Sequence, residues 1–289
     1  MPGNYKKYGL LIVLLLFLAV DIFLVRLDVK HSQKFLTFGM LDVGQGEALF
    51  IESPNGAQIL FDAGPARKVL APLKSVMSPF DRTLDAVVIT NPDADHIGGF
   101  ADILKYYQVG LVLEPGTQNS SKTFQNLKTK IKDQKTPVIL AKKGMRINMG
   151  DGAVIDILFP DRDVSSWSTN EGSVVARLRY GATSIMLTGD ATSETEKIIL
   201  ASNPQKEVKS KILKVGHHGS RSSTSAAFFR AVAPDYALVS LGKGNSYGHP
   251  HREVLETLVE GGTKIFRTDL FGTIILRSDG KTEAFSVHR

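Results

Sequence analysis

Cysteine is absent from all 289 residues of the chain. This absence excludes a disulfide framework, a thiolate metal site and a cysteine nucleophile. Any metal ion must therefore be held by histidine, aspartate, glutamate or asparagine. Long low-complexity tracts are also lacking. With 43% hydrophobic and 22% charged residues, the composition is typical of a protein with a sizeable core and excludes a disordered or collagen-like chain.

The charge balance is moderately basic, because 35 Lys and Arg residues outnumber 29 Asp and Glu residues. A net charge of +6 permits anionic partners without requiring one. The basic residues between positions 122 and 146 fit the solvated side of an amphipathic helix. A second basic run is better placed to contact phosphates, since it leads up to a histidine pair; it comprises Lys206, Lys209, Lys211, Lys214 and Arg221.

Residues 1–30 differ in character from the rest and are predicted to be a membrane anchor or signal segment. Two lysines precede an apolar run from Leu10 to Val20, and the run resumes after Asp21. From Tyr8 to Leu27 the segment is long enough to span the roughly 30 Å hydrocarbon core as a helix. No small-residue cleavage pattern follows, which favours an uncleaved anchor over a cleaved signal peptide. An amphipathic or buried helix at the domain edge is a further alternative.

The lysines before this run favour a cytoplasmic N-terminus. We therefore expect a single-pass protein of the cell membrane whose larger part is extracytoplasmic, or a secreted protein if the segment is cleaved.

Residues 31–289 are predicted to form one domain in which short strands and helices alternate. Neither a Ser/Gly/Pro-rich linker nor an internal repeat interrupts them. Asn-Gly and Tyr-Gly turns join neighbouring strands, which favours mixed or antiparallel sheets. Helices are expected over residues 98–107, 122–132, 193–201, 223–231 and 252–260, and strands over 35–43, 48–53, 58–64, 84–90, 109–115, 137–144, 153–160, 173–180 and 183–190.

The densest polar cluster, Asp93, Asp95 and His96, lies where a strand gives way to a helix. Side chains on a loop held at both ends can converge on one cation. Asp95 acting as a helix N-cap is the structural alternative. Two further strand ends carry metal-competent groups beside glycine, namely Asp190 and the pair His217–His218, which capping alone does not explain.

These motifs resemble those of the metallo-β-lactamase superfamily, and most closely the metallohydrolase domain of ComEC-type DNA-uptake proteins. The resemblance runs from about Phe38 to Phe271 and rests on the stretches MLDVGQGEALFIESPNG, LFDAG, ITNPDADHIGGF, NEGSVVARL, MLTGDA, LKVGHHGS and NSYGHPHREVL. It implies an α+β fold, an αββα sandwich that follows the N-terminal transmembrane helix. It also implies hydrolysis by metal-activated water, in this branch of phosphodiesters.

The resemblance assigns metal ligands position by position: Asn91, Asp93, Asp95, His96, Asp190, His217 and His218. Asn91 stands where the motif normally begins with histidine, and Thr169 and Asn170 replace an intermediate histidine. We therefore expect one firm site, made by Asp95, His96, Asp190 and a histidine of the His217–His218 pair, and a second that is weak or empty. One or two divalent ions, zinc or manganese, suit such ligands.

The same resemblance suggests roles in catalysis. Asp93 or Asp190 is expected to accept a proton, and His218 or His249 to protonate the leaving oxygen. Asn170 and Ser220 are expected to bind phosphoryl oxygens, and Asp62 to orient the metal loop. Asp42 is a further candidate whose alternative is a turn carboxylate. His249 and His251 have the alternative of a solvent-facing loop and a helix cap.

The predicted function is a metal-dependent phosphodiesterase or nuclease that acts on extracellular or incoming DNA and is related to competence. Its partners would be nucleic acid as substrate, the membrane through the N-terminal helix, and proteins of the competence machinery. Two alternatives remain: a phosphodiesterase of the cell envelope, and a degenerate, metal-poor binding module.

Overall fold

The computed structural model describes residues 8–9, 11–21 and 35–288. Contacts divide the chain into two units, residues 1–34 and 35–289. In the first unit, residues 11–21 are helical and their side chains are exposed. Among the described residues, no helix is long and apolar enough to cross a membrane. The predicted anchor also includes residues 10 and 22–27, and the predicted domain boundary lies at residues 30 and 31; both fall outside the described residues.

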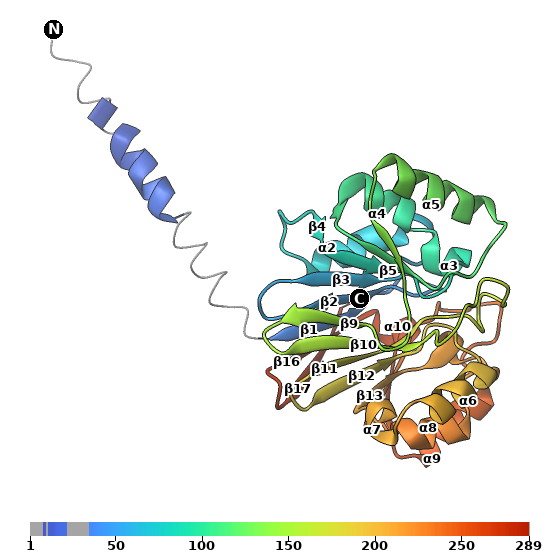
Figure 1. Ribbon diagram of the computed structural model, residues 1–289. Helices are drawn as coiled ribbons and strands as arrows, with labels where there is room; N and C mark the ends of the chain where they lie inside the picture. The colour runs from blue at the N-terminus through green and yellow to red at the C-terminus, as the bar shows by residue number, and fades with distance from the viewer. Residues whose placement is uncertain (1–7, 10, 22–34, 289) are drawn as a thin grey trace, which may run out of the picture. The chain divides into compact units, whose positions relative to one another are not determined.

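The second unit contains two large mixed sheets (Figure 1). The first has eight strands in the order β17-β16-β1-β2-β3-β5-β7-β8. Most neighbours are antiparallel, whereas β3, β5, β7 and β8 run parallel. Its strands are β1 (Leu36–Met40), β2 (Leu49–Glu52), β3 (Gln58–Phe61), β5 (Ala86–Val88), β7 (Val112–Glu114), β8 (Val138–Leu140), β16 (Thr273–Ser278) and β17 (Glu283–His288).

The second sheet has seven strands in the order β15-β14-β13-β12-β11-β10-β9. Strands β9 to β12 form antiparallel hairpins, and β12 to β15 run parallel. The strands are β9 (Arg146–Gly150), β10 (Ala153–Phe159), β11 (Val175–Tyr180), β12 (Thr183–Leu187), β13 (Ile212–Lys214), β14 (Tyr236–Val239) and β15 (Lys264–Arg267). A small third sheet pairs β4 (Thr83–Leu84) with β6 (Gln108–Val109).

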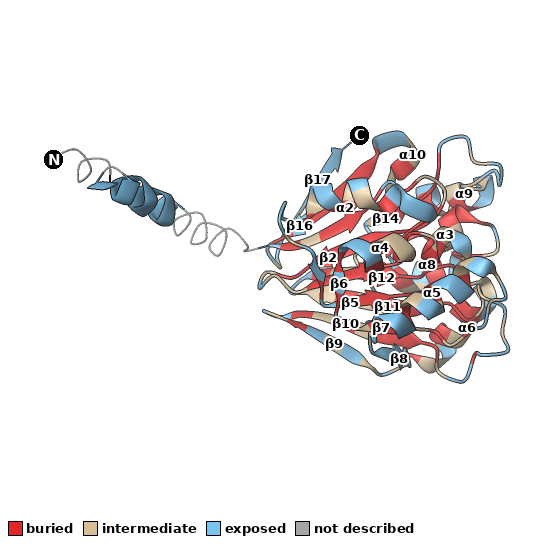
Figure 2. Ribbon diagram, turned by 90° about the horizontal axis from the view of Figure 1, so that it is seen from above, coloured by how far each residue is buried: buried red, intermediate tan, exposed pale blue. Residues whose placement is uncertain are grey.

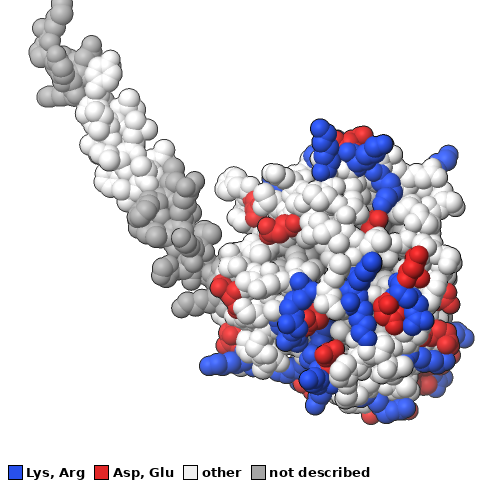
Figure 3. Space-filling view, viewed as in Figure 1, with Lys and Arg blue, Asp and Glu red and all other residues white. Residues whose placement is uncertain are grey.

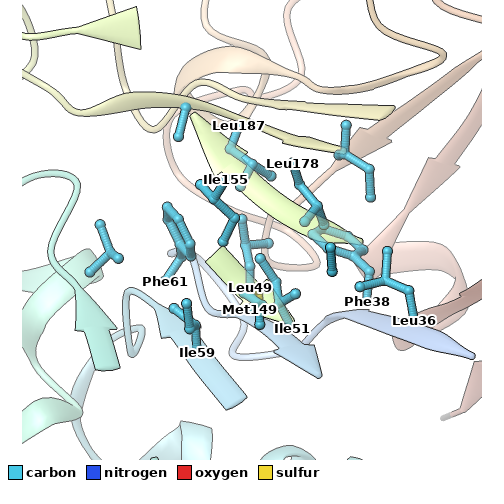
Figure 4. Close-up of a cluster of buried hydrophobic side chains, with 14 of the residues drawn as sticks. Leu36, Phe38, Leu49, Ile51, Ile59, Phe61, Met149, Ile155, Leu178 and Leu187 are labelled. Carbon is cyan, nitrogen blue, oxygen red and sulfur yellow. The ribbon is translucent and has the colours of Figure 1, made fainter. Parts of the chain in front are cut away.

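Apolar side chains fill the space between the two large sheets (Figure 4). Phe38, Ile51 and Phe61 come from the first sheet, and Ile155 and Leu178 from the second; all are buried. Successive residues of a strand point to opposite faces, so each strand gives alternate side chains to this core. The opposite faces of both sheets need a separate cover.

Helices supply that cover (Figure 2). Over the first sheet lie η1 (Ala66–Val69), α2 (Leu70–Val76), α4 (Phe100–Tyr106) and α5 (Lys122–Asp133). Over the second lie α6 (Ser193–Ser202), α7 (Gln205–Val208), α8 (Ala226–Val232) and α9 (Arg252–Glu260). The basic helix α5 buries Phe124, Leu127 and Ile131 and leaves none of its lysines buried, as its amphipathic spacing predicts. The predicted αββα sandwich is confirmed.

Candidate metal centre

Loops that follow three strands bring four polar side chains together. Asp95 and His96 lie in the short helix α3 (Ala94–Ile97) after β5, and Asp190 follows β12. His218 lies in the 3-10 turn η2 (Gly216–Gly219) after β13. One ligand atom of each side chain lies within 4.8 Å of the others. Because β5 belongs to one sheet and the other two strands to the second, both halves of the sandwich contribute to this centre.

Asp62, directly after β3, holds His96 in place. Its Oδ2 lies 2.7 Å from His96 Nδ1, and its Oδ1 accepts a hydrogen bond of 2.8 Å from the Thr90 amide. Both side chains are fully buried. With Asp62 Oδ2 as the acceptor, His96 donates from Nδ1 and turns Nε2 towards Asp190, at 3.1 Å from Oδ2.

His218 is oriented in the same way by a backbone carbonyl. Its Nδ1 donates a hydrogen bond of 2.8 Å to the Ser240 oxygen. Nε2 is thereby left 3.4 Å from Asp95 Oδ2 and 3.8 Å from Asp190 Oδ1. His217 and His218 both have positive φ angles, 47° and 56°, and so turn the chain sharply at the end of β13. Such a conformation is costly for residues other than glycine and is common at functional sites.

A divalent cation fits this arrangement. The Nε2 atoms of His96 and His218 and the Oδ1 atom of Asp190 are buried and form no well-aligned hydrogen bond with the described part of the chain. Their nearest polar neighbours are one another, since His96 Nε2 faces Asp190, and His218 Nε2 faces Asp95 and Asp190. Two imidazole nitrogens and two carboxylates form a donor set that both zinc and manganese accept. The four side chains could therefore hold one ion.

The electrostatics of the centre also favour a positive charge there. Burial alone would lower the pKa of His96, but the carboxylates of Asp190 and Asp62 outweigh burial and raise it well above its usual value. Burial would likewise raise the pKa of Asp190, yet the charges of His96 and His218 hold it well below its usual value. The ion-free protein consequently keeps a proton on His96 where a metal ion would bind.

Asn91 and Asp93 are bound to other side chains instead. Asn91 Nδ2 donates to Asn170 Oδ1 at 2.7 Å, and its Oδ1 accepts from the Asp93 amide at 2.9 Å. Asp93 accepts a hydrogen bond of 2.8 Å at each carboxylate oxygen, one from Asn119 and one from Thr169. Direct hydrogen bonds thus occupy the side chains for which the sequence predicted a first metal position, and Asp93 is not a member of the four-residue group.

His217 and Ser220 lie beside the four-residue group. His217 Nε2 is 3.6 Å from Asp190 Oδ2, and its Nδ1 is 3.2 Å from Ser222 Oγ. Ser220 Oγ is 3.0 Å from the same Ser222 hydroxyl. Burial, together with the neighbouring charges of His218 and Lys214, lowers the pKa of His217. His218, rather than His217, is therefore the member of the pair that belongs to the group.

His249 joins the centre to the surface through a row of rings. Its ring centroid lies 6.4 Å from that of His218 and 5.6 Å from that of Tyr247, and both pairs are stacked. Tyr247 is 64% exposed. Burial, helped by His218, His217 and His251, lowers the pKa of His249 to about 4. An uncharged imidazole at neutral pH suits hydrogen bonding better than the predicted donation of a proton.

Asp42 and Lys214 each have a partner within the fold. The Asp42 carboxylate accepts a hydrogen bond from the Gly44 amide at 3.1 Å, which is the turn role weighed as its alternative. Lys214 was predicted to be placed for contact with phosphates, and that prediction is wrong: its side chain is fully buried and forms an ion pair with Glu47. The sequence reasoning missed Glu47 and Asn119 as well.

Comparison with known proteins identifies the family. The model of the metallo-beta-lactamase superfamily matches residues 41–243. The chain belongs to this superfamily. Among solved metallo-beta-lactamase-fold structures, YhfI from Bacillus subtilis superposes with a TM-score of 0.55 over 84% of this chain and all of that chain, at 12% sequence identity. That likeness shows the shared fold.

Within the metallo-beta-lactamase superfamily, the chain is homologous to competence proteins. It is 32% identical to ComE operon protein 3 of Bacillus subtilis, over 86% of this chain and 34% of that protein. It is 29% identical to Competence protein ComA of Neisseria gonorrhoeae, over 81% of this chain and 31% of that protein. The chain thus spans about a third of the length of these relatives. The predicted resemblance to the ComEC-type branch is confirmed.

Proposed function

We propose that this protein is a metal-dependent phosphodiesterase whose substrate is DNA. The observation that carries the proposal is the group Asp95, His96, Asp190 and His218, in which three buried polar atoms face one another and form no well-aligned hydrogen bond among the described residues. A divalent cation bound there would lower the pKa of a water molecule and would stabilise negative charge on the phosphoryl oxygens. The homology to competence proteins favours a nucleic acid over other phosphodiesters.

The residues of this chain favour a centre with one ion. Asn91 and Asn170 are joined to each other, and both oxygens of Asp93 already accept hydrogen bonds. Binding of a second ion would require these hydrogen bonds to break. The only charged ligand it would then have besides Asp190 is Asp93. The bound oxygens of Asp93 can still accept a proton, because a carboxylate has about four lone-pair positions. Asp93 therefore acts as the proton acceptor of the reaction.

Further groups around the ion position bind the substrate. The hydroxyl of Ser220, through Ser222, is linked to His217 at the rim of the centre. The Oδ1 atom of Asn170 accepts a hydrogen bond from Asn91, which leaves the Asn170 amide nitrogen as a donor. These neutral donors hold phosphoryl oxygens, and His249 stabilises the leaving oxygen as a hydrogen-bond donor.

The proposed setting of the reaction rests on the sequence of the first thirty residues. An apolar segment from Tyr8 to Leu27, preceded by two lysines, anchors the domain outside the cytoplasm, or directs its secretion if it is cleaved. The protein then acts on extracellular or incoming DNA alongside other competence proteins.

The test is cleavage of single-stranded and double-stranded DNA by the full chain in mild detergent. Zinc or manganese is added back after chelation, and Asp190→Asn is compared with Asp133→Asn, which removes an exposed carboxylate of α5. We expect cleavage that needs the ion, is lost in Asp190→Asn and is retained in Asp133→Asn. Cleavage of a small diester but not of DNA would favour a cell-envelope substrate. A folded protein that binds no ion would favour the binding module.

A further inference from the structure

A basic groove lies on the outer face of the second sheet, formed by residues of β9, β10, β11 and α7 and the loops beside them. Its volume is about 450 Å³. No member of the metal centre lines it. On the side of the molecule seen in Figure 3, Lys and Arg side chains gather over the region of β9 and β10. The five cations that line the groove are Lys143, Arg146, Arg177, Arg179 and Lys206.

Only two carboxylates, Asp156 and Glu207, line the same groove. Asp156 is already shared, since Arg146 Nε lies 2.6 Å from one of its oxygens and Arg179 Nη2 lies 2.6 Å from the other. Burial alone would raise the pKa of Asp156, but these two arginines outweigh it and lower the pKa. The carboxylate is therefore charged, and it neutralises at most one of the arginines that bind it.

Arg177 is one of the cations of this groove that form no ion pair with a described carboxylate, although Asp156 and Glu207 attract its charge. Its Nε donates to Ser210 Oγ at 3.2 Å and its Nη1 to the Lys206 carbonyl at 2.9 Å. Both partners are neutral, and no ion pair with a carboxylate is formed by Arg177 within the described chain. Burial and the charge of Arg179 lower its pKa. A half-buried guanidinium fixed by two hydrogen bonds, with Nη2 left without a partner among the described residues, is suited to bind an anion.

Lys143 and Lys206 add to this excess. The Lys143 ammonium donates to the Ser202 carbonyl and forms no ion pair with a described carboxylate. Lys206 is exposed at the start of α7 and likewise has no such ion pair. Three cations without a carboxylate partner thus surround a groove large enough for a phosphate and its sugar.

We propose that this groove is a second binding site, which holds backbone phosphates of a nucleic-acid strand away from the metal centre. A strand with one negative charge per phosphate matches a row of fixed cations, and Arg binds phosphate through its paired N–H groups. Apolar side chains of Met145, Ile157 and Leu158 also line the groove, between the cations. Since no metal ligand takes part, the site works without an ion and does not depend on hydrolysis.

The experiment measures anisotropy of a fluorescein-labelled single-stranded oligonucleotide with the full chain in mild detergent and excess EDTA. The variants are Arg177→Met, Arg177→Lys and Lys206→Met. Lys132→Met, on the exposed side of α5, removes the same charge elsewhere. We expect Arg177→Met to raise Kd about tenfold, the loss of one charge-assisted hydrogen bond. The slope of log K against log salt should fall by about 1.

Lys206→Met should weaken binding less than Arg177→Met does, since the Lys206 ammonium is more solvated. The Kd of Arg177→Lys should lie between those of Arg177→Met and the wild type. Lys132→Met should bind as the wild type does. Because Lys206 is exposed, its variant tests the groove even if Arg177→Met folds poorly. Equal Kd values for the wild type, Arg177→Met and Lys206→Met would overturn the proposal. If Arg177→Met weakened the binding of pyrophosphate but not that of the oligonucleotide, nucleic acid would be overturned as the ligand of the groove.

A second readout separates this proposal from the proposed hydrolase. With the ion restored, wild type and Arg177→Met should hydrolyse bis(p-nitrophenyl) phosphate at the same rate, because Arg177 lies outside the four-residue group. If the wild type did not hydrolyse this diester, the proposed hydrolase activity would be contradicted. The oligonucleotide binding measured in EDTA would be unaffected by that result.

Discussion

Lys214 and Glu47 form an ion pair in which both side chains have no exposed surface. Lys214 Nζ also donates a hydrogen bond of 2.8 Å to the carbonyl of Gly189, the residue before Asp190. The pair therefore connects β13 with the first sheet and fixes the backbone that presents Asp190.

We predict that Lys214→Met is strongly destabilising, because it leaves Glu47 buried without a counter-charge. Breaking a buried pair costs roughly 3–5 kcal/mol. The double change Glu47→Gln with Lys214→Met should cost less than the sum of the two single changes, which urea denaturation of the four proteins measures. A strictly additive result would contradict the coupling.

Proton release should accompany ion binding. The raised pKa of His96 means that the ion-free imidazole is charged at neutral pH, and the ion must displace that proton. As the pH rises towards the pKa of His96, the apparent affinity should increase about tenfold per pH unit, and it should level off above that pKa. Calorimetry in buffers of different ionisation enthalpy counts the protons. Release of none would show that His96 is neutral before the ion binds.

Removal of the acceptor behind His96 should weaken ion binding. In wild type, one oxygen of Asp62 accepts from the Thr90 amide, and the other contacts the Thr90 hydroxyl and His96 Nδ1. Asp62→Asn replaces one of these two acceptor oxygens by an NH2 group, which cannot accept a hydrogen bond. Loss of such a partner lowers metal affinity by about 10–100-fold. Competition with a chromophoric chelator measures this change. Thr90→Val is the matched control, since it removes a hydrogen bond to Asp62 and leaves the contact between Asp62 and His96; a similar loss in both would argue against orientation of His96.

The number of bound ions should be one, and the pair Asn91–Asn170 should be the reason. Asn91→His together with Asn170→His removes the amide hydrogen bond and adds two imidazole ligands, so we expect a second ion to bind. Equilibrium dialysis followed by elemental analysis counts the ions per chain. Two ions in the wild type would contradict the one-ion centre. Asn148→His, in the edge strand β9, controls for ion binding by an added histidine alone.

The sequence predicted the fold where local patterns determine it. The helix expected over residues 252–260 is α9, and the one over residues 122–132 is α5. Helix α5 begins at Lys122 because the hydroxyl of Ser121, its N-cap, accepts a hydrogen bond from the Phe124 amide. Strand β9 was not predicted. It lies at the edge of its sheet, and its sequence, RINMG, alternates polar and apolar residues over only five positions, which is a weak signal without the pairing to β10.

The candidate site shows the same division. Asp95, His96, Asp190 and His218 were found because each follows an apolar strand and lies near glycine. Lys214 was misjudged because its partner Glu47 is distant in sequence, although a lysine within the apolar run ILKV signals a buried counter-charge. Asn119 was missed because it reaches Asp93 from the loop after β7, a contact that only the folded chain creates.

The position of β1 has a mechanical consequence. The domain begins at this strand, which is paired antiparallel with β2 on one side and with β16 on the other. A pulling force applied at Phe35 would have to break two hydrogen-bonded ladders at once, one with β2 and one with β16, which follows β1 by more than 200 residues. If the chain is held at this end, the force acts on β1, an interior strand that is paired on both sides, and not on the edge strands of the sheet.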